Sequence, residues 1–243
     1  MDTTNAIKQS NIQAIILDFD GTLADTQPLI VSSIHRTIAE LHLPPRTDAQ
    51  CRSIIGLPLK ECFTTLLSVD DAMAERCADI YRRVFDEDNH TGAVVLFPHV
   101  LETLKELHDR GLLLAVCSSR GRPTLERFIA DFQLNECIEM VVSADDVQRH
   151  KPHPDPLLKI LASLGVSPEE ALMVGDASYD ILMGRNAGCR TCGVTYGNQS
   201  AEDLRAAGAD FLIDDFRELA NVLTLTAPGR SRSRPRGCTG GCV

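Results

Sequence analysis

Six short hydrophobic runs alternate along the chain with segments whose hydrophobic residues recur every three or four positions. Compact apolar runs of this kind are typical of strands buried in a parallel sheet. The intervening segments have the period of amphipathic helices, as in residues 98–111, where Gly111 provides a stop. The alternation predicts an α/β fold, with a Rossmann-like parallel sheet covered by helices on both faces. The predicted strands occupy residues 12–19, 112–119, 139–144, 171–177, 192–196 and 211–215.

The stretch from residue 26 to residue 96 departs from this alternation. It contains two helical stripes and no pattern that predicts a strand. Because it follows the first strand, we expect an inserted helical cap domain over residues 26–96, joined to the core by linkers near residues 24–28 and 93–98. The first stripe consists of Ile30, Ile34, Ile38 and Leu41, and the second of Met73, Cys77, Ile80, Tyr81 and Val84.

The rest of the chain completes the expected domain organisation. Residues 1–25 and 97–227 are predicted to form the α/β core domain. Residues 228–243 are rich in Pro, Gly, Ser and Arg, and they contain four Arg and no acidic residue. A segment of this composition buries too little apolar surface to fold, so we expect a disordered basic tail.

Composition and charge narrow the functional classes. The chain has 243 residues, of which 44% are hydrophobic, and a net charge of −10. This length supports a sizeable core, and the acidic balance disfavours nucleic-acid binding, which needs a basic surface. No apolar run is long enough to cross a bilayer, and the first residues lack the pattern of a secretory signal. We expect a cytoplasmic protein without a membrane or nucleic-acid partner, and the oligomeric state, monomer or homodimer, stays open.

The nine cysteines are scattered along the chain. Cys189 and Cys192 have the spacing found in some zinc and redox sites, but no second pair of Cys or His stands nearby to complete a zinc site. Their segment also reads as a strand rather than as the start of a helix, where redox pairs lie. Reduced structural thiols are therefore expected.

Acidic residues follow two of the predicted strands directly. Asp18 and Asp20 come after the first strand and are followed by Gly21, and Asp176 and Asp180 come after the fourth. An Asx turn would explain one Asp before a Gly, but not two carboxylates here and matching ones elsewhere. The carboxyl ends of parallel strands are where α/β sheets bind ligands. Converging carboxylates make a hard oxygen site, which favours Mg²⁺ over zinc.

A phosphate ligand would need hydrogen-bond donors and positive charge at the same edge. Ser118 and Ser119 end the second predicted strand, where hydroxyl groups and loop amides can both face the site. Lys151 follows the third strand. A single lysine is most often a solvated surface charge, but its coincidence with the other groups indicates a phosphate site.

The segments DFDGTLADT, CSSR, HKPHPDP and GDASYD, in this order, resemble the four motifs of the haloacid dehalogenase superfamily. The resemblance extends from about Ile12 to Asp215. The insert after the first motif, with the segment Ile55 to Leu59, resembles the helical cap of the phosphoglycolate phosphatase and β-phosphoglucomutase-like group. The presence of Asp20 favours phosphoryl transfer over dehalogenation, because the dehalogenases of the superfamily lack a second Asp at this place.

The resemblance implies a role for each matched residue. Asp18 is the expected nucleophile, which forms an aspartyl-phosphate, and Asp20 is the expected general acid and base. Ser118, with Ser119 beside it, is expected to bind the phosphoryl group, and Lys151 to neutralise charge. Mg²⁺ is expected on Asp18, Asp176 and the backbone carbonyl of Asp20, with Asp180 supporting the metal or Lys151.

The implied function is a magnesium-dependent phosphatase that acts on a small phosphorylated metabolite, a phosphoglycolate-like monoester. Three alternatives remain: a sugar-phosphate mutase resembling β-phosphoglucomutase, an enzyme resembling phosphonoacetaldehyde hydrolase, and a binding protein that keeps the fold without activity. The hydrolase would need a Schiff-base lysine in the cap, and Lys60 is near the right place. The pattern around Lys60 also fits the exposed face of a helix.

Overall fold

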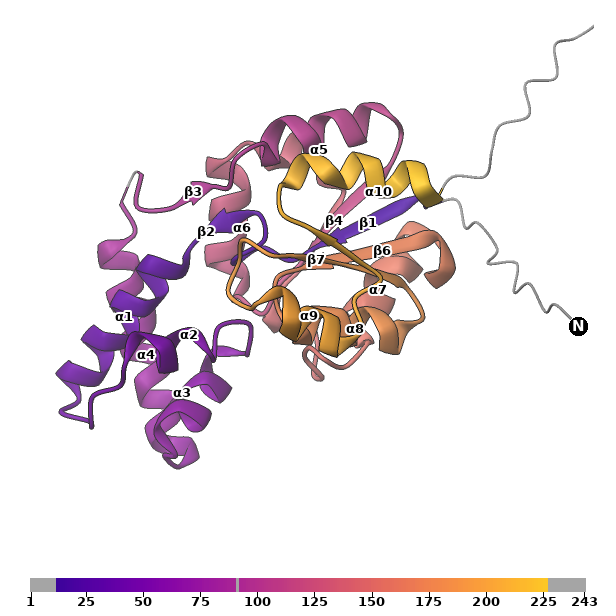
Figure 1. Cartoon of the computed structure of the whole chain (residues 1–243). Helices are drawn as coiled ribbons and strands as arrows, with labels where there is room; N and C mark the ends of the chain where they lie inside the picture. The colour runs from indigo at the N-terminus through magenta and orange to yellow at the C-terminus, as the bar shows by residue number, and fades with distance from the viewer. Residues whose placement is uncertain (1–11, 91, 227–243) are drawn as a thin grey trace, which may run out of the picture.

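Six parallel strands form one sheet in the order β5-β4-β1-β6-β7-β8 (Figure 1). The computed structural model describes residues 12–90 and 92–226. Each strand lies within or overlaps one of the hydrophobic runs, so the predicted parallel sheet is confirmed. The strands are β1 (Ala14–Leu17), β4 (Leu113–Cys117), β5 (Met140–Val142), β6 (Ala171–Gly175), β7 (Arg190–Val194) and β8 (Phe211–Ile213).

Helices cover both faces of this sheet (Figure 1). Side chains of a strand alternate between the two faces. Ile15 and Leu17 pack with one group of helices, and Ala14 and Ile16 pack with the other. The first group is α5 (Val100–Asp109), α6 (Arg122–Asp131) and α10 (Leu219–Thr226), and the second includes α7 (Asp155–Leu164) and α8 (Ser178–Ala187), while α9 (Ala201–Ala207) follows β7.

The order of the strands creates a switch point at β1. From β1 the sheet extends to β4 and β5 on one side and to β6, β7 and β8 on the other. The loops after β1, β4 and β6 therefore leave the same edge of the sheet at its centre. In open α/β sheets this is where ligands bind.

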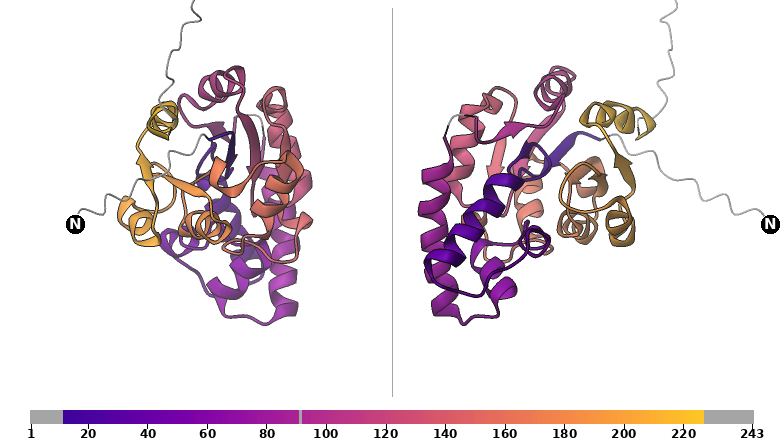
Figure 2. Two further views of the ribbon diagram at one scale, coloured as in Figure 1. Left: turned by 90° about the vertical axis from the view of Figure 1, so that its right-hand side faces the viewer. Right: turned by 60° about the vertical axis from the view of Figure 1, so that its left-hand side comes forward.

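Residues 27–88 form a group of four helices at one end of the molecule, here called the helical insert (Figures 1 and 2). Both predicted hydrophobic stripes face its interior, as shown by the burial of Ile34 on one helix and of Cys77 and Tyr81 on another. Asp70 begins the last helix by accepting a hydrogen bond from the Met73 amide. The helices are α1 (Gln27–Glu40), α2 (Asp48–Arg52), α3 (Leu59–Leu67) and α4 (Asp71–Asp88).

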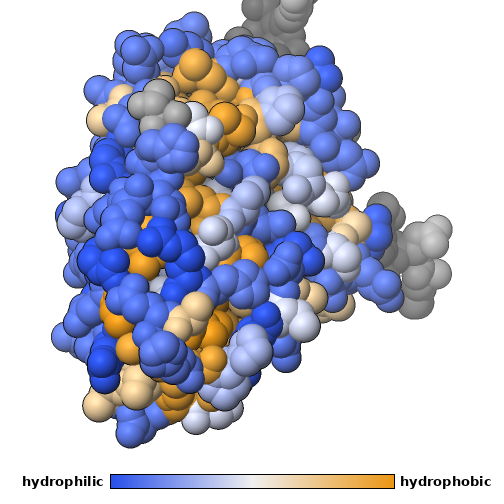
Figure 3. All heavy atoms as spheres, turned by 90° about the vertical axis from the view of Figure 1, so that its left-hand side faces the viewer, coloured by the Kyte–Doolittle hydropathy of each residue, from blue (hydrophilic) through white to orange (hydrophobic). Residues whose placement is uncertain are grey.

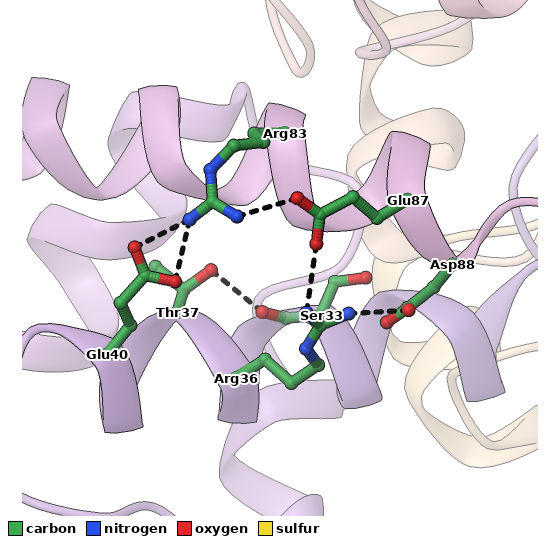
Figure 4. A network of polar contacts seen from close by, with 7 residues as sticks. All are labelled: Ser33, Arg36, Thr37, Glu40, Arg83, Glu87 and Asp88. Atoms are coloured by element: carbon green, nitrogen blue, oxygen red, sulfur yellow. Dashed lines mark hydrogen bonds and ion pairs between the residues drawn. The ribbon is translucent and has the colours of Figure 1, made fainter.

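An ion-pair network on the surface joins the first and last helices of the helical insert (Figure 4). Arg83 on α4 contacts Glu40 on α1 and Glu87 on its own helix, and Arg36 on α1 contacts Glu87 and Asp88. Figure 3 shows the side of the molecule on which the insert lies, where hydrophobic atoms appear between mostly hydrophilic side chains. The insert is thus held by an apolar interior with charged residues outside.

Two short strands connect the helical insert to the sheet. β2 (Ala24–Asp25) and β3 (Val95–Leu96) pair in antiparallel fashion, with Ala24 opposite Leu96. The expectation of no strand between residues 26 and 96 was therefore wrong for β3, the last two residues of that stretch. A two-residue strand is too short to show a periodic pattern. Both strands lie in the predicted linkers, so the two linkers are hydrogen-bonded to each other.

Some sequence-based expectations fall outside the described residues. These are the basic tail, residues 228–243, and residues 1–11 of the predicted core. None of the helices in the described part of the chain combines the length and hydrophobicity that a membrane span requires.

Candidate active site

Four predicted site residues meet at the central edge of the sheet. Asp18 directly follows β1, Ser118 follows β4 and Asp176 follows β6, and the three side chains are buried. Because β4, β1 and β6 are neighbours, the fold brings together residues that lie up to 158 positions apart in the sequence. Lys151, from the loop after β5, enters the same place.

Lys151 links two of these carboxylates. Its Nζ donates to Asp18 Oδ1 at 2.6 Å and to Asp180 Oδ1 at 2.7 Å, and all three side chains are buried. Burial lowers the pKa of Lys151, but the charges of Asp18 and Asp180 more than offset this and raise it above its usual value. Lys151 therefore remains a buried cation beside Asp18.

Oxygen ligands for a metal ion lie at the same point. Carboxylate oxygens of Asp18, Asp176 and Asp180 all lie within 4.8 Å of one another. A set of carboxylates without nitrogen or sulfur suits Mg²⁺. The side chain of Asp20, the other predicted metal residue, points to a different partner, so its predicted metal contact through the backbone carbonyl stays a prediction.

Glycines leave the space that these carboxylates fill. A Cβ atom on Gly21, whose φ is +85°, would lie 2.2 Å from Asp176 Oδ2. A Cβ atom on Gly197 would lie 2.5 Å from the same oxygen, and one on Gly175 would lie 2.3 Å from Asp180 Cβ. The backbone thus approaches Asp176 as closely as glycine allows, and the residues present fit a small cation held by carboxylates.

Three buried carboxylates, those of Asp18, Asp176 and Asp180, lie beside the single lysine Lys151, so their negative charge is only partly balanced. Burial raises the pKa of Asp18 well above its usual range, against the effect of Lys151, and nearby carboxylates raise it further. Burial and the charge of Asp180 raise the pKa of Asp176 to about 7. A divalent cation between these groups would stabilise their ionised forms.

Ser118, Ser119 and Lys151 line one small cavity, together with His150. Ser118 Oγ accepts a hydrogen bond from the amide of Arg120 at 3.2 Å, which leaves its own hydrogen free to be donated. Ser119 Oγ is buried without a hydrogen-bond partner. Buried hydroxyl groups are usually paired, so the unpaired Ser119 is suited to receive a ligand oxygen.

Asp20 is paired with an arginine that the sequence reasoning did not single out. Arg120 holds the Asp20 carboxylate with two hydrogen bonds, Nη2 to Oδ1 at 2.6 Å and Nε to Oδ2 at 3.1 Å. Arg120 is the last residue of the segment CSSR, directly after Ser118 and Ser119, the serines expected to bind phosphate. Its place at a strand end, next to those serines, was the signal that could have identified it.

Asn198 is a second residue that the sequence reasoning missed. Its backbone amide and its side-chain amide both donate to Asp176 Oδ2, at 2.7 and 2.6 Å. The Asn198 side chain also accepts a hydrogen bond from Gln27, the first residue of α1. One asparagine therefore connects a candidate metal ligand with the helical insert. A loop asparagine among Gly, Ser and Gln carries no pattern that distinguishes this role.

Two other candidates lie away from this centre. Lys60 on α3 is exposed and pairs with Asp71 at 2.9 Å, as expected for the outer face of a helix. Cys189 and Cys192 are buried free thiols whose pKa values burial raises to about 12. They join different hydrophobic clusters, and within the described residues neither belongs to a group of possible metal ligands.

Comparisons with known proteins agree with this geometry. The sequence pattern of the family described as "Haloacid dehalogenase-like hydrolase" matches residues 15–194. The chain is 33% identical to the pyrophosphatase PpaX of Anoxybacillus flavithermus over 217 residues, which cover 89% of this chain and 99% of the relative. The structure is similar to that of a hydrolase from Pseudomonas syringae, with a TM-score of 0.79, 25% identity and coverage of 89% and 100%.

The fold is also similar to that of a predicted phosphoglycolate phosphatase from Haemophilus somnus. That comparison has a TM-score of 0.78 and 24% identity, and it covers 88% of this chain and 98% of the other. At this identity the similarity supports the fold alone. The matched family residues include the ends of β1, β4 and β6, where the candidate site lies.

Proposed function

Because the chain belongs to the haloacid dehalogenase-like hydrolase family, we propose that it is a magnesium-dependent phosphatase that forms an aspartyl-phosphate on Asp18. The observation that carries the proposal is the buried contact of Lys151 with Asp18 and Asp180, beside Asp176. Burying charged groups costs desolvation free energy even when they are paired, and perturbed pKa values of this kind are typical of active sites. The proposed substrate is a small phosphorylated metabolite.

In the first half of the proposed reaction, an Asp18 oxygen attacks phosphorus. A bond forms between this oxygen and phosphorus, the bond to the leaving oxygen breaks, and the leaving group keeps the electron pair. Lys151 offsets the repulsion between the carboxylate and the phosphoryl oxygens. Ser118 donates its hydroxyl hydrogen to the phosphoryl group, and Ser119 is free to do the same.

Mg²⁺ would be held by Asp18, Asp176 and the Asp20 carbonyl, with Asp180 beside them. When bound, it supplies positive charge to the transferring phosphoryl group. Asn198 fixes the orientation of the Asp176 carboxylate through two hydrogen bonds. Lys151 likewise fixes the orientation of the Asp18 and Asp180 carboxylates through one hydrogen bond to each.

In the second half, water attacks the aspartyl-phosphate and phosphate is released. Protonated Asp20 is proposed to give its proton to the leaving oxygen in the first half, and the resulting carboxylate to take one from this water in the second. Its carboxylate lies two residues after the nucleophile and is partly buried. The helical insert would act as the cap that excludes bulk water during the first half.

The names of relatives suggest which substrates to test first. The relative at 33% identity is named a pyrophosphatase, which makes inorganic pyrophosphate the first candidate beside phosphoglycolate-like monoesters. The net charge of −10 supports a small-molecule substrate rather than a nucleic acid. We also propose a cytoplasmic location without a membrane partner.

The direct test is a phosphate-release assay over pyrophosphate and a panel of small phosphate esters. The wild-type protein should turn over at least one of them with Mg²⁺ and lose the activity in excess chelator. Calcium should not replace magnesium, because it takes more ligands at longer distances. Absence of turnover over the whole panel, or full activity in chelator, would contradict the proposal.

A further inference from the structure

Arg120 occupies an unusual position between the sheet and the helical insert. Its guanidinium lies 4.7 Å from the ring centre of Phe85 on α4 and 5.2 Å from that of Phe128 on α6. Only 9% of its side chain and 13% of that of Asp20 are exposed. A guanidinium packed against two aromatic rings is held at a fixed place and keeps its charge.

Few positive charges are paired with the carboxylates of the site. The carboxylates of Asp18, Asp176 and Asp180 surround Lys151, whose hydrogen bonds go to two of them. Within residues 12–90 and 92–226, the remaining cation paired with a site carboxylate is Arg120. A second anionic group of a substrate that reaches Asp20 would therefore meet a positive partner in Arg120.

The geometry around Asp20 matches the binding of such a group. The guanidinium presents two nitrogens, Nε and Nη2, to two oxygens of one carboxylate. The same fork binds the oxygens of a phosphate or of another carboxylate equally well. Burial lowers the pKa of Arg120, but the charge of Asp20 and its hydrogen bonds to the guanidinium raise it, and the net result is a raised pKa.

We propose that Arg120 is a specificity-determining residue that selects substrates whose leaving group carries an anion of its own, such as the second phosphoryl group of a diphosphate. When such a substrate binds, the guanidinium exchanges the Asp20 carboxylate for the anion of the leaving group, and both Asp20 oxygens become free. This inference rests on the proposed phosphatase function and names the substrate class for the same site.

The helical insert also contacts Arg120. Phe85 stacks on the guanidinium from the insert and contacts Phe128 of the core with ring centres 6.3 Å apart. Tyr81 precedes Phe85 by one helical turn and packs against it at 5.7 Å. An anionic leaving group on Arg120 would therefore lie at the boundary of core and insert.

The test compares two substrates on the same protein preparation. In bound inorganic pyrophosphate the portion that will leave already carries negative charge. In bound p-nitrophenyl phosphate the nitrophenyl portion is uncharged until the bond breaks. The Arg120→Met variant should lower the ratio of kcat/KM for pyrophosphate to that for p-nitrophenyl phosphate by about 10- to 100-fold, the range expected for lost hydrogen bonds to a charged group. Most of the change should appear in KM for pyrophosphate.

Arg127→Met is the matched control. Arg127 lies on α6 and pairs with Asp86 on α4 at 2.9 Å, so it joins the same two helices through an exposed ion pair. Its removal should leave the ratio as in the wild-type protein. The ratio does not depend on the fraction of folded protein, and Arg120→Lys, which keeps the charge but not the fork, should give an intermediate ratio.

The outcomes separate this inference from the proposed function. If the wild-type protein hydrolyses p-nitrophenyl phosphate with Mg²⁺ and Arg120→Met lowers both activities equally, the specificity role is wrong and the phosphatase proposal stands. If Arg120→Met does not fold, Arg120→Lys decides the question. A ratio of kcat/KM for pyrophosphate to that for p-nitrophenyl phosphate equal to the wild-type ratio would then overturn the inference. If no phosphate compound is hydrolysed, the proposed function itself is wrong.

Discussion

Gly21 shows at the scale of one residue how the backbone makes room for the site. Its φ of +85° lies in the left-handed region, and a Cβ atom there would overlap Asp176 Oδ2 and the side-chain nitrogen of Asn198. Two requirements therefore meet at this position: a turn directly after β1 and a close approach to a carboxylate. A side chain at Gly21 would therefore move a candidate metal ligand.

Gly21→Ala should destabilise the protein and weaken magnesium binding. The cost has two parts, about 1–2 kcal/mol for the backbone conformation and the displacement of Asp176 by the new methyl group. Gly111→Ala is the matched control, because Gly111 has the same φ of +85° and no atom within 4 Å of its would-be Cβ. Urea unfolding and magnesium titration would measure both effects. Equal losses of stability in the two variants, with magnesium binding intact, would contradict the role assigned to Gly21.

Asp176 gives the metal-free protein a pH dependence whose sign can be derived. Its pKa is raised from 3.8 to about 7 by burial, so the folded state binds its proton more tightly than the unfolded state. The stability from this group is fully present below the unfolded pKa and is lost as pH rises through about 7. In chelator the melting temperature should fall between pH 6 and pH 8, and added Mg²⁺ should raise it more at pH 8.

The control for this pH dependence is Asp176→Asn, which removes the titrating carboxylate. Melting curves of this variant in chelator should show a smaller fall over the same pH range. A melting temperature that rises with pH in the metal-free wild-type protein would contradict the argument.

At the scale of elements, the helical insert depends on its apolar interior more than on its surface charges. Phe63 on α3 is 1% exposed and packs edge-on against Tyr81 of α4. The network of Arg83, Glu40 and Glu87 lies on the surface, where ion pairs are screened by water and salt (Figure 4). The insert thus has an apolar interior, which is continuous with the hydrophobic cluster on one face of the sheet.

Phe63→Ala should lower the free energy of unfolding by about 3–5 kcal/mol, because it leaves a cavity between α3 and α4. Arg83→Ala should have a small effect that decreases further in high salt. Urea unfolding of both variants at low and high ionic strength measures the difference. A larger loss for Arg83→Ala than for Phe63→Ala would show that the surface network holds the insert.

The elements differ in how much of them the sequence could predict. The central strands were predictable because β1 and β6 are buried on both faces and appear as continuous hydrophobic runs. β2 and β3 were not, since a pair of two-residue strands is defined by a contact between distant segments and not by a local pattern. The same reason explains why the linkers were located but their pairing was not.

At the scale of the whole molecule, the site is assembled from loops at one edge of the sheet. Asp18 and Asp176 were predictable because carboxylates at strand ends indicate chemistry, and Lys151 was predictable because it coincides with them and with the family motifs. The place of Arg120 beside the serines could have identified it, but its contact with Asp20 could not be predicted, and neither could the contact of Asn198 with Asp176. These contacts exist only when β4, β1 and β6, and the loop after β7, lie side by side.

The whole arrangement suits the chemical event that we propose, the transfer of a phosphoryl group to Asp18. Lys151 and the carboxylates of Asp176 and Asp180 converge on this side chain, and Ser118 and Ser119 line a small cavity together with Lys151. If Asp18 were only a metal ligand, the same residues would act without a covalent intermediate. The two cases differ in whether the protein itself carries phosphate during turnover.

The most direct measurement is mass spectrometry of the protein quenched in acid during turnover of a substrate that it hydrolyses with Mg²⁺. We predict one added phosphoryl group on the peptide that contains Asp18, absent in the Asp18→Asn variant and in chelator. Asp18→Asn should also lose turnover while keeping its fold, because the amide is nearly the same size but is a poor nucleophile. An unmodified Asp18 peptide during steady turnover, or wild-type turnover by Asp18→Asn, would contradict the account.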